Sequence, residues 1–187
     1  MPPIPSDMTV ADQKKPWLWG RLSPLGLGLA VLTVAIDQLH KYWMLAVYEI
    51  QGKGRVAITP FLDLEYVKNT GISYGLLLQD SRQGQWLLAG FAGLAVVVMA
   101  CWLARGVTAR LVAASLGLVV GGAASNAIDR LALGGVADFF SLHALGFYWY
   151  VFNLADVAIV AGVIGLLYDS FGPSRNDASK ALERLVA

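Results

Sequence analysis

Four long apolar segments constrain this chain more than any other feature of its sequence. A helix of about 20 apolar residues crosses the hydrocarbon core of a bilayer, and each segment reaches or approaches that length. The segments lie at about 23–45, 85–103, 111–128 and 154–171. The 187 residues are 57% hydrophobic and 14% charged, whereas ordinary soluble domains carry roughly 25% charged residues. The sequence therefore predicts an all-α membrane protein with four transmembrane helices and a small β element.

Composition argues against several other classes of protein. The net charge of +1 argues against nucleic-acid binding, because proteins that bind nucleic acids are usually strongly basic. The single cysteine, Cys101, excludes an intrachain disulfide and a cysteine-cluster metal site. The zinc-peptidase motif His-Glu-x-x-His is absent from the sequence. We expect no metal and no cofactor, so a hydrolytic site would depend on carboxylates, with a Ser73–Lys68 pair as a weaker alternative.

The two ends of the chain differ in composition from its centre. Residues 1–20 are polar and rich in proline and are expected to form a flexible cytoplasmic tail, and residues 172–187 a second one. Residues 21–171 then form one membrane domain. Within it, an outward loop at about 47–84 contains the β element, because apolar and polar residues nearly alternate over 62–68, the pattern of a half-buried strand.

Lysine and arginine residues indicate how the chain is oriented in the membrane. By the positive-inside rule, short segments rich in these residues remain in the cytoplasm. They gather before the first apolar segment, between the second and third, and after the fourth: Lys14, Lys15, Arg21, Arg105, Arg110, Arg175, Lys180 and Arg184. We therefore expect both termini in the cytoplasm and the two longer loops outside.

Two pairs of polar side chains lie four residues apart near the outward ends of predicted helices, where charge is unfavourable. Asp37 and Lys41 share one face of the first helix near its outward end. This pair fits either a neutralised ion pair that tethers the helix end or a contact with substrate. Asn126 and Arg130 share a face of the third helix, beside small residues at 121–124. They fit helix packing, or the binding of a backbone carbonyl or a lipid headgroup.

Two further carboxylates indicate chemistry at the outward membrane boundary. Asp138 lies in an apolar stretch just after the third predicted helix, and Asp156 lies at the start of the fourth. Two neighbouring carboxyl groups can share one proton, so that one activates water while the other protonates a leaving amine. Asn153 and Asp156 also have the spacing of a helix capping box, which needs no catalysis.

The residues alone leave two other functions open. One is a small transporter or ion relay built on Asp37, Lys41 and Asp156, for which polar residues should extend through the membrane interior. The other is a non-catalytic scaffold assembled through the glycine-rich face of the third helix. The scaffold gives no reason for a carboxylate at position 138.

Five motifs occur in the order seen in lipoprotein signal peptidases, also called signal peptidase II, which this chain resembles over about residues 37–169. The motifs are Asp37-Gln38-x-x-Lys41, Asn69-Thr70-Gly71, the run from Gly121 to Arg130, Val136-Ala137-Asp138-Phe139 and Phe152-Asn153-Leu154-Ala155-Asp156. After Asn-Thr-Gly the family usually continues Ala-Ala-Phe, whereas this chain has Ile72-Ser73-Tyr74. The departure concerns fine substrate contacts rather than the carboxylates.

The resemblance implies a specific enzyme. The family consists of aspartic endopeptidases of the bacterial inner membrane, with four transmembrane helices and an extracytoplasmic β-cradle. They remove the signal peptide from diacylglyceryl-modified prolipoproteins, cutting before the lipidated cysteine, and globomycin-type peptide antibiotics inhibit them. The catalytic pair corresponds to Asp138 and Asp156. The residues expected to line and brace the substrate site are Asp37, Lys41, Asn69, Gly71, Asn126, Arg130 and Asn153.

The resemblance also implies where the protein acts and what it meets. We expect a monomer with its active site at the periplasmic face of the membrane. Its partners would be the lipidated precursor, the surrounding membrane lipids and peptide inhibitors of the globomycin type.

Overall fold

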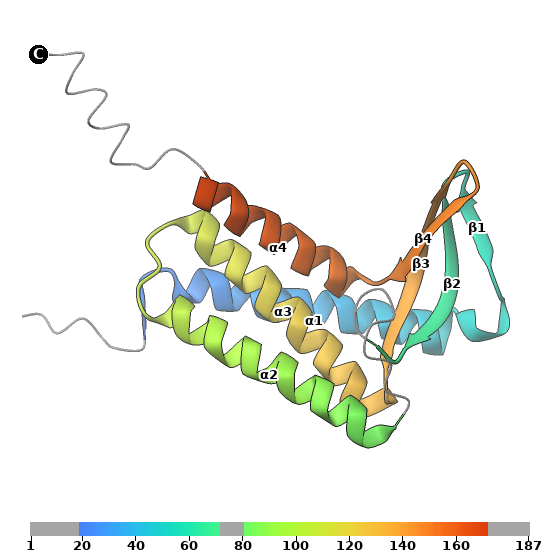
Figure 1. Cartoon of the computed structure of the whole chain (residues 1–187), viewed down its shortest axis with the longest axis horizontal. Coiled ribbons are helices and arrows are strands. Elements are labelled where there is room, and N and C mark those ends of the chain that lie inside the picture. Colours follow the sequence, from blue (N-terminus) through green and yellow to red (C-terminus); the bar gives the residue numbers. More distant parts are fainter. Residues whose placement is uncertain (1–18, 72–80, 172–187) are drawn as a thin grey trace, which may run out of the picture.

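A bundle of α-helices with a β-sheet at one end makes up the part of the chain that the structure describes (Figure 1). The structure is a computed structural model and describes residues 19–71 and 81–171. The helices are α1 (Ser23–Tyr42), α2 (Arg82–Ala104), α3 (Arg110–Leu133) and α4 (Leu154–Phe171). The strands are β1 (Val56–Thr59), β2 (Leu62–Asn69), β3 (Val136–Ala144) and β4 (Phe147–Phe152). A π-helical turn, η1 (Trp43–Val47), and a 3₁₀ turn, η2 (Ile50–Gly52), connect α1 to β1.

The helices confirm the predicted membrane protein. Within the described ranges, α2, α3 and α4 are each long and apolar enough to cross a membrane. Helix α1 has 20 residues, a length of about 30 Å, and its outer side is apolar, with Val31 and Leu39 largely exposed. Its last two turns carry Asp37, Gln38 and Lys41, so its charged residues lie at the end nearest the sheet.

Helix α3 lies at the centre of the bundle and packs against the other three helices. Glycines stand where its backbone approaches its neighbours most closely. A Cβ added at Gly121 would lie 2.6 Å from the Ala30 carbonyl oxygen of α1, and one added at Gly122 would lie 2.5 Å from the Ala155 carbonyl oxygen of α4. Small residues permit such backbone contacts between membrane helices. The run at 121–124 therefore serves helix packing, one of the two uses predicted for this face.

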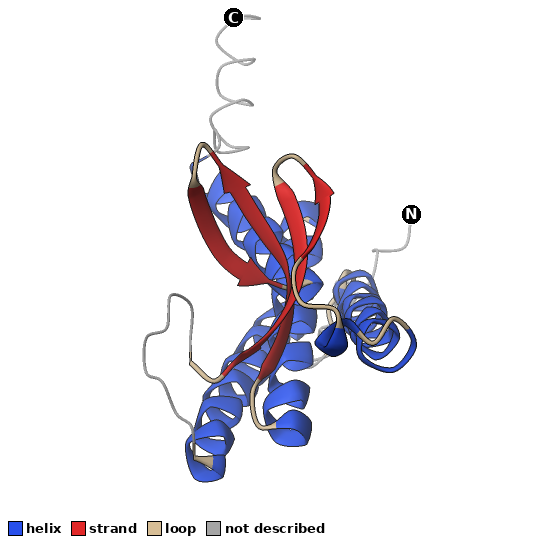
Figure 2. Cartoon of the chain, turned by 90° about the vertical axis from the view of Figure 1, so that its right-hand side faces the viewer, coloured by secondary structure: helices blue, strands red, loops and turns tan. Residues whose placement is uncertain are grey.

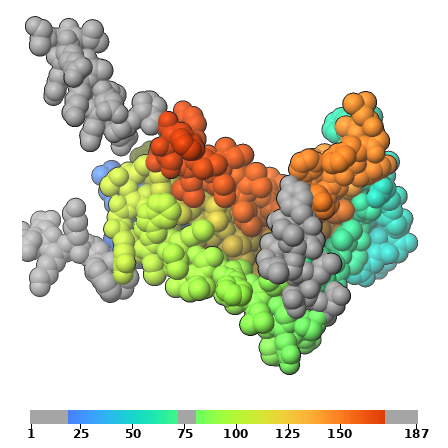
Figure 3. Space-filling view, viewed as in Figure 1, coloured from blue at the N-terminus to red at the C-terminus, as the bar shows by residue number. Residues whose placement is uncertain are grey.

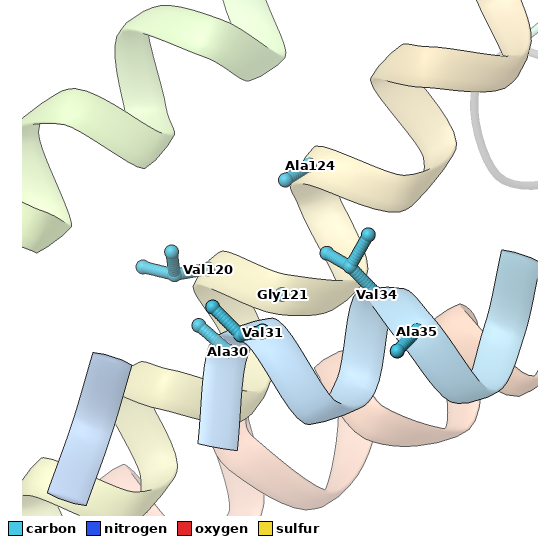
Figure 4. Close-up of a pocket in the computed structure, with 7 residues that line it drawn as sticks. All are labelled: Ala30, Val31, Val34, Ala35, Val120, Gly121 and Ala124. Carbon is cyan, nitrogen blue, oxygen red and sulfur yellow. The ribbon is translucent and has the colours of Figure 1, made fainter. Parts of the chain in front are cut away.

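An apolar groove of about 380 Å³ lies beside this contact, between α1 and α3 (Figure 4). Its walls are aliphatic residues and glycine: Ala30, Val31, Val34, Ala35, Val120, Gly121 and Ala124. The groove lies along the middle of the helices rather than at their polar ends. It therefore offers no chemistry of its own.

The sheet is antiparallel, with the strand order β1-β2-β3-β4, and it stands at the polar end of the bundle (Figure 2). The predicted strand at 62–68 is confirmed as part of β2. Strands β3 and β4 are not predicted from the sequence, which marks the segment that holds Asp138 only as an apolar stretch. The first four residues of β3 are buried, so Val136, Ala137 and Phe139 surround Asp138 without the alternation that marks a half-buried strand.

A small apolar core joins the sheet to the end of α1. Met44 of η1 and Ile50 of η2 pack with Ala137 and Phe139 of β3, and all four side chains are at most 1% exposed. This contact fixes β3, and with it Asp138, against the bundle. The β3–β4 hairpin stands away from α4, and the space-filling view shows a notch between the two (Figure 3).

Candidate active site

The polar residues predicted from the sequence meet where the helix bundle joins the sheet. Continuous hydrogen bonds and ion pairs link all nine of them, although they come from the end of α1, the second half of α3, strands β2 and β3, and the start of α4. The nine are Asp37, Lys41, Asn69, Gly71, Asn126, Arg130, Asp138, Asn153 and Asp156.

Asp138 is a buried carboxylate on β3, only 1% exposed. The side-chain amide of Asn153 donates to its Oδ1 at 2.6 Å, and that of Asn69 donates to its Oδ2 at 3.1 Å. Burial raises the pKa of Asp138 from 3.8 to about 7, and the negative charge of Asp156 adds to the increase, while the two amides oppose it. Asp138 can therefore carry a proton at neutral pH.

Asp156 lies in the first turn of α4 and forms the predicted capping box with Asn153. The backbone N–H of Asp156 donates to Asn153 Oδ1 at 2.9 Å, and the N–H of Asn153 donates to Asp156 Oδ2 at 3.2 Å. The other carboxylate oxygen, Oδ1, accepts from Asn126 Nδ2 at 2.8 Å. Capping therefore orients the carboxylate and does not exclude a chemical role for it.

Asn153 and Asn126 connect the two carboxylates. Asn153 caps α4 with its side-chain oxygen while its Nδ2 contacts both Asp138 and, at 3.1 Å, Asn126 Oδ1. Neutral amide donors fix the direction of both carboxylates without neutralising either. Two acids held in this way can share a proton, which is the requirement for aspartic peptidase chemistry.

Arg130 binds a backbone carbonyl, one of the uses predicted for it. Its NH2 donates to the Gly71 oxygen at 3.1 Å and its NH1 to the Asn126 oxygen at 3.3 Å. The N–H of Gly71 donates in turn to Asn69 Oδ1 at 3.0 Å. Arg130 thereby holds the chain that leaves β2, and Asn69, against the end of α3.

The segment that follows Gly71 lies outside the described residues from 72 to 80. It includes Ile72-Ser73-Tyr74, so the predicted effect on substrate contacts and the Ser73–Lys68 alternative stay predictions. The stretch Gly71-Ile72-Ser73-Tyr74-Gly75 has the Gly-x-Ser-x-Gly spacing of hydrolase nucleophile elbows. Such an elbow joins a strand to a helix at the top of an α/β-hydrolase sheet, whereas the described sheet is antiparallel throughout.

The buried pair Asp37–Lys41 matches its predicted spacing. Lys41 Nζ lies 2.7 Å from Asp37 Oδ2, and the two side chains are 3% and 1% exposed. Lys41 also lies 2.7 Å from Asp129 and donates to Asn126 Oδ1 at 3.2 Å. An ammonium group has three donors, and here each has a partner within the protein. The geometry favours the bracing role over the substrate contact.

Sequence reasoning missed three further members of this network. Gln38 Nε2 donates to Asp129 Oδ1 at 2.8 Å and to Ser125 Oγ at 2.9 Å, and the Ser125 hydroxyl donates to Asp37 Oδ2 at 2.7 Å. Ser125 and Asp129 are four residues apart and so share a helix face. That spacing was a signal for both. Gln38 and Asp129 also stand in two of the motifs that carry the family resemblance, although neither was given a role there.

The raised pKa of Asp138 predicts a pH-dependent stability. Between pH 4 and 7 the folded protein holds a proton at Asp138 that the unfolded chain releases, so stability present at low pH is lost as pH rises through this window. The change is on the order of 4 kcal/mol. Thermal unfolding in detergent from pH 4 to 8 should show this decline in the parent and a flatter profile in Asp138→Asn. Equal slopes in the two proteins would contradict the raised pKa.

Fold and site together define the class of this protein. It is a multi-pass membrane protein with one buried and one half-buried aspartate at one end of its helix bundle, the arrangement of a membrane aspartic peptidase.

Comparison with known proteins gives the family. The profile of the peptidase A8 family, described as Signal peptidase (SPase) II, matches residues 29–172. The chain belongs to the signal peptidase II family. It is 47% identical over 172 residues to a lipoprotein signal peptidase of Methylocella silvestris, covering 86% of this chain and 100% of that one. It is 50% identical over 166 residues to one from Nitrobacter hamburgensis, covering 86% and 99%.

Two solved structures share the fold. Both are described as bacterial membrane enzymes, and both are 23% identical to this chain. The first has a TM-score of 0.68, and the match covers 87% of this chain and 96% of the solved chain. The second has a TM-score of 0.66, and the match covers 86% of this chain and 100% of the solved chain. The predicted fold, a helical membrane domain with a small sheet, is confirmed.

Proposed function

We propose that this chain removes the signal peptide from diacylglyceryl-modified prolipoproteins by cutting the bond before the lipidated cysteine. The observation that carries the proposal is the pair of Asp138, which is buried, and Asp156, which is half-buried, both held by amide side chains where the bundle meets the sheet. A cysteine that carries acyl chains stays in the bilayer, so its peptidase must present acids at the membrane boundary. The names of the relatives in the family support the same substrate.

The two aspartates have different roles in this mechanism. Asp156 lies at a helix N-terminus, which favours a negative charge, and it acts as the base that deprotonates the attacking water. Asp138 holds the shared proton, because burial raises its pKa to about 7, and it donates a hydrogen bond to the scissile carbonyl. The tetrahedral intermediate then collapses as a proton passes to the cysteine nitrogen. The proton is shared, so the pair titrates as a unit.

The position of the site supports the proposed topology. The sheet stands at one end of the bundle, and the polar network lies at that end, where α1 ends and α4 begins. We place this end at the periplasmic face of the bacterial inner membrane, with four helix crossings and both termini in the cytoplasm. An ion relay would need polar side chains through the membrane interior, whereas this network is confined to one end. We further propose a monomeric enzyme that globomycin-type peptides inhibit at the aspartate pair.

A cleavage assay with two matched precursors tests the proposed function. The full chain in detergent micelles is given a diacylglyceryl-modified precursor, and in parallel the same precursor with an unmodified cysteine. Mass spectrometry should show release of the signal peptide from the lipidated precursor, with the cut directly before the cysteine. Cleavage of both precursors at equal rates, or a cut elsewhere, would contradict the proposed specificity.

A further inference from the structure

The two aspartates of the site share a feature of their backbone. Each follows a fully buried alanine, Ala137 before Asp138 and Ala155 before Asp156. Each alanine donates its backbone N–H to a carboxylate of the helix bundle. The N–H of Ala137 donates to Asp129 Oδ2 at 3.1 Å, and the N–H of Ala155 donates to Asp37 Oδ1 at 2.9 Å.

One cation joins these two carboxylates. Lys41 Nζ lies 2.7 Å from Asp37 Oδ2 and 2.7 Å from Asp129 Oδ2. A continuous path therefore runs from the residue before Asp138, through Asp129, Lys41 and Asp37, to the residue before Asp156. The group at the centre of this path is 3% exposed, where water screens charges little.

We infer that Asp37, Lys41 and Asp129 are positioning residues that set the separation of the two reacting aspartates by holding the backbone one residue before each. The inference rests on the proposed function of Asp138 and Asp156.

The backbone N–H groups of Ala137 and Ala155 lie where they support this inference. The alternative is that Asp37 and Asp129 only neutralise the charge of Lys41. An ion pair within α1 needs only Asp37 and Lys41. The amide of Ala155 belongs to the first turn of α4, whose N–H groups have no partner in their own helix, and the amide of Ala137 belongs to β3. Strand β4 already connects β3 to the start of α4. The path through Asp129, Lys41 and Asp37 adds a second link, which ties both backbones to the helix bundle. The link also contacts the dyad side chains, because Lys41 donates to Asn126, which donates to Asp156.

Kinetics of two variants test the positioning role. Asp129→Asn removes one charge of the path and keeps the size of the side chain, and Lys41→Met removes the cation. A displacement of about 1 Å in a catalytic group can lower a rate about 100-fold, so we expect kcat on the lipidated precursor to fall about 10- to 100-fold while KM changes little. Lys41→Arg keeps the charge and should recover part of the loss.

The control is Asp63→Asn, which removes another buried carboxylate from the sheet. Asp63 is 4% exposed and lies 3.2 Å from His143 Nε2, away from the path. This variant should keep the parental kcat. A normal kcat in folded Asp129→Asn, or a loss confined to KM, would overturn the inference. So would an equal loss of kcat in Asp63→Asn. If Lys41→Met does not fold, Asp129→Asn decides alone.

A spectroscopic measurement separates this inference from the proposed function. Infrared titration can follow the protonated carboxyl of Asp138, identified by its absence in Asp138→Asn, without any substrate. The positive charge of Lys41 lowers the pKa of Asp138, so in Lys41→Met this group should titrate at higher pH. If the parent fails to cut the lipidated precursor, the proposed function fails. An Asp138 titration that is unmoved in Lys41→Met then overturns the positioning role as well.

Discussion

Asp138→Asn and Asp156→Asn are each expected to lower kcat on a lipidated precursor by about 10³- to 10⁴-fold. An amide at either position can neither take a proton from water nor share one with its partner. Both substitutions preserve the size of the side chain, and the buried core around β3 does not depend on either carboxylate. The measurement is single-turnover cleavage in detergent, with substrate binding followed separately.

A matched control lies on the same helix as Asp156. Asp169 is exposed in the last turn of α4, so Asp169→Asn makes the same chemical change far from the site and should keep the parental rate. A variant that does not fold or does not bind substrate would also be slow. Folding and substrate binding of the Asp138 and Asp156 variants are therefore measured together with their rates. Turnover near the parental rate in either folded variant would contradict the assignment of the pair.

Gly122→Ala is the second substitution expected to have a large effect. The added Cβ would lie 2.5 Å from the Ala155 carbonyl oxygen and 2.7 Å from Ile159 Cγ1, so α4 must move away from α3. Overpacking of this kind costs about 1–3 kcal/mol in stability. Ala155 is next to Asp156, and a shift of about 1 Å in a reacting group can reduce the rate about 100-fold. We therefore expect a lower unfolding temperature together with a rate reduced about 100-fold.

Gly90→Ala provides the comparison. Gly90 is also an interior helical glycine, but a Cβ added there meets no atom of the described chain within 4 Å. Alanine has the higher helix propensity, so this variant should be as stable as the parent or slightly more stable. The two variants are compared by thermal unfolding and cleavage in the same detergent. Equal behaviour would show that the close contact between α3 and α4 does not position the site.

The features that could be predicted from the sequence are those set by local spacing. Apolar length predicted the helices, the distance of four residues predicted the contact of Asp37 with Lys41, and alternation predicted β2. The capping box of Asn153 and Asp156 belongs to the same group. Resemblance to the family then identified nine residues, and the structure places all of them in one network.

The features that could not be predicted depend on contacts between distant parts of the chain. The first four residues of β3 are buried on both faces, so this part of the strand lacks the alternation by which a half-buried strand is predicted. The roles of Asp129 and Gln38 depend on how α1 and α3 face each other. The hydrogen bond from Ala155 to Asp37 comes from a backbone N–H, which no side-chain pattern reveals.

The spacing of Asp37 and Lys41 also matters while the chain is being made. Helix α1 is synthesised and inserted first, but Asn126 and the amide of Ala155 lie 85 and 118 residues away from their partners on it. Until those residues arrive, the contact between Asp37 and Lys41 is the interaction that keeps two opposite charges neutralised within a nascent membrane helix. Asp156 enters with the last helix, so the proposed pair of Asp138 and Asp156 is complete only when that helix has been inserted.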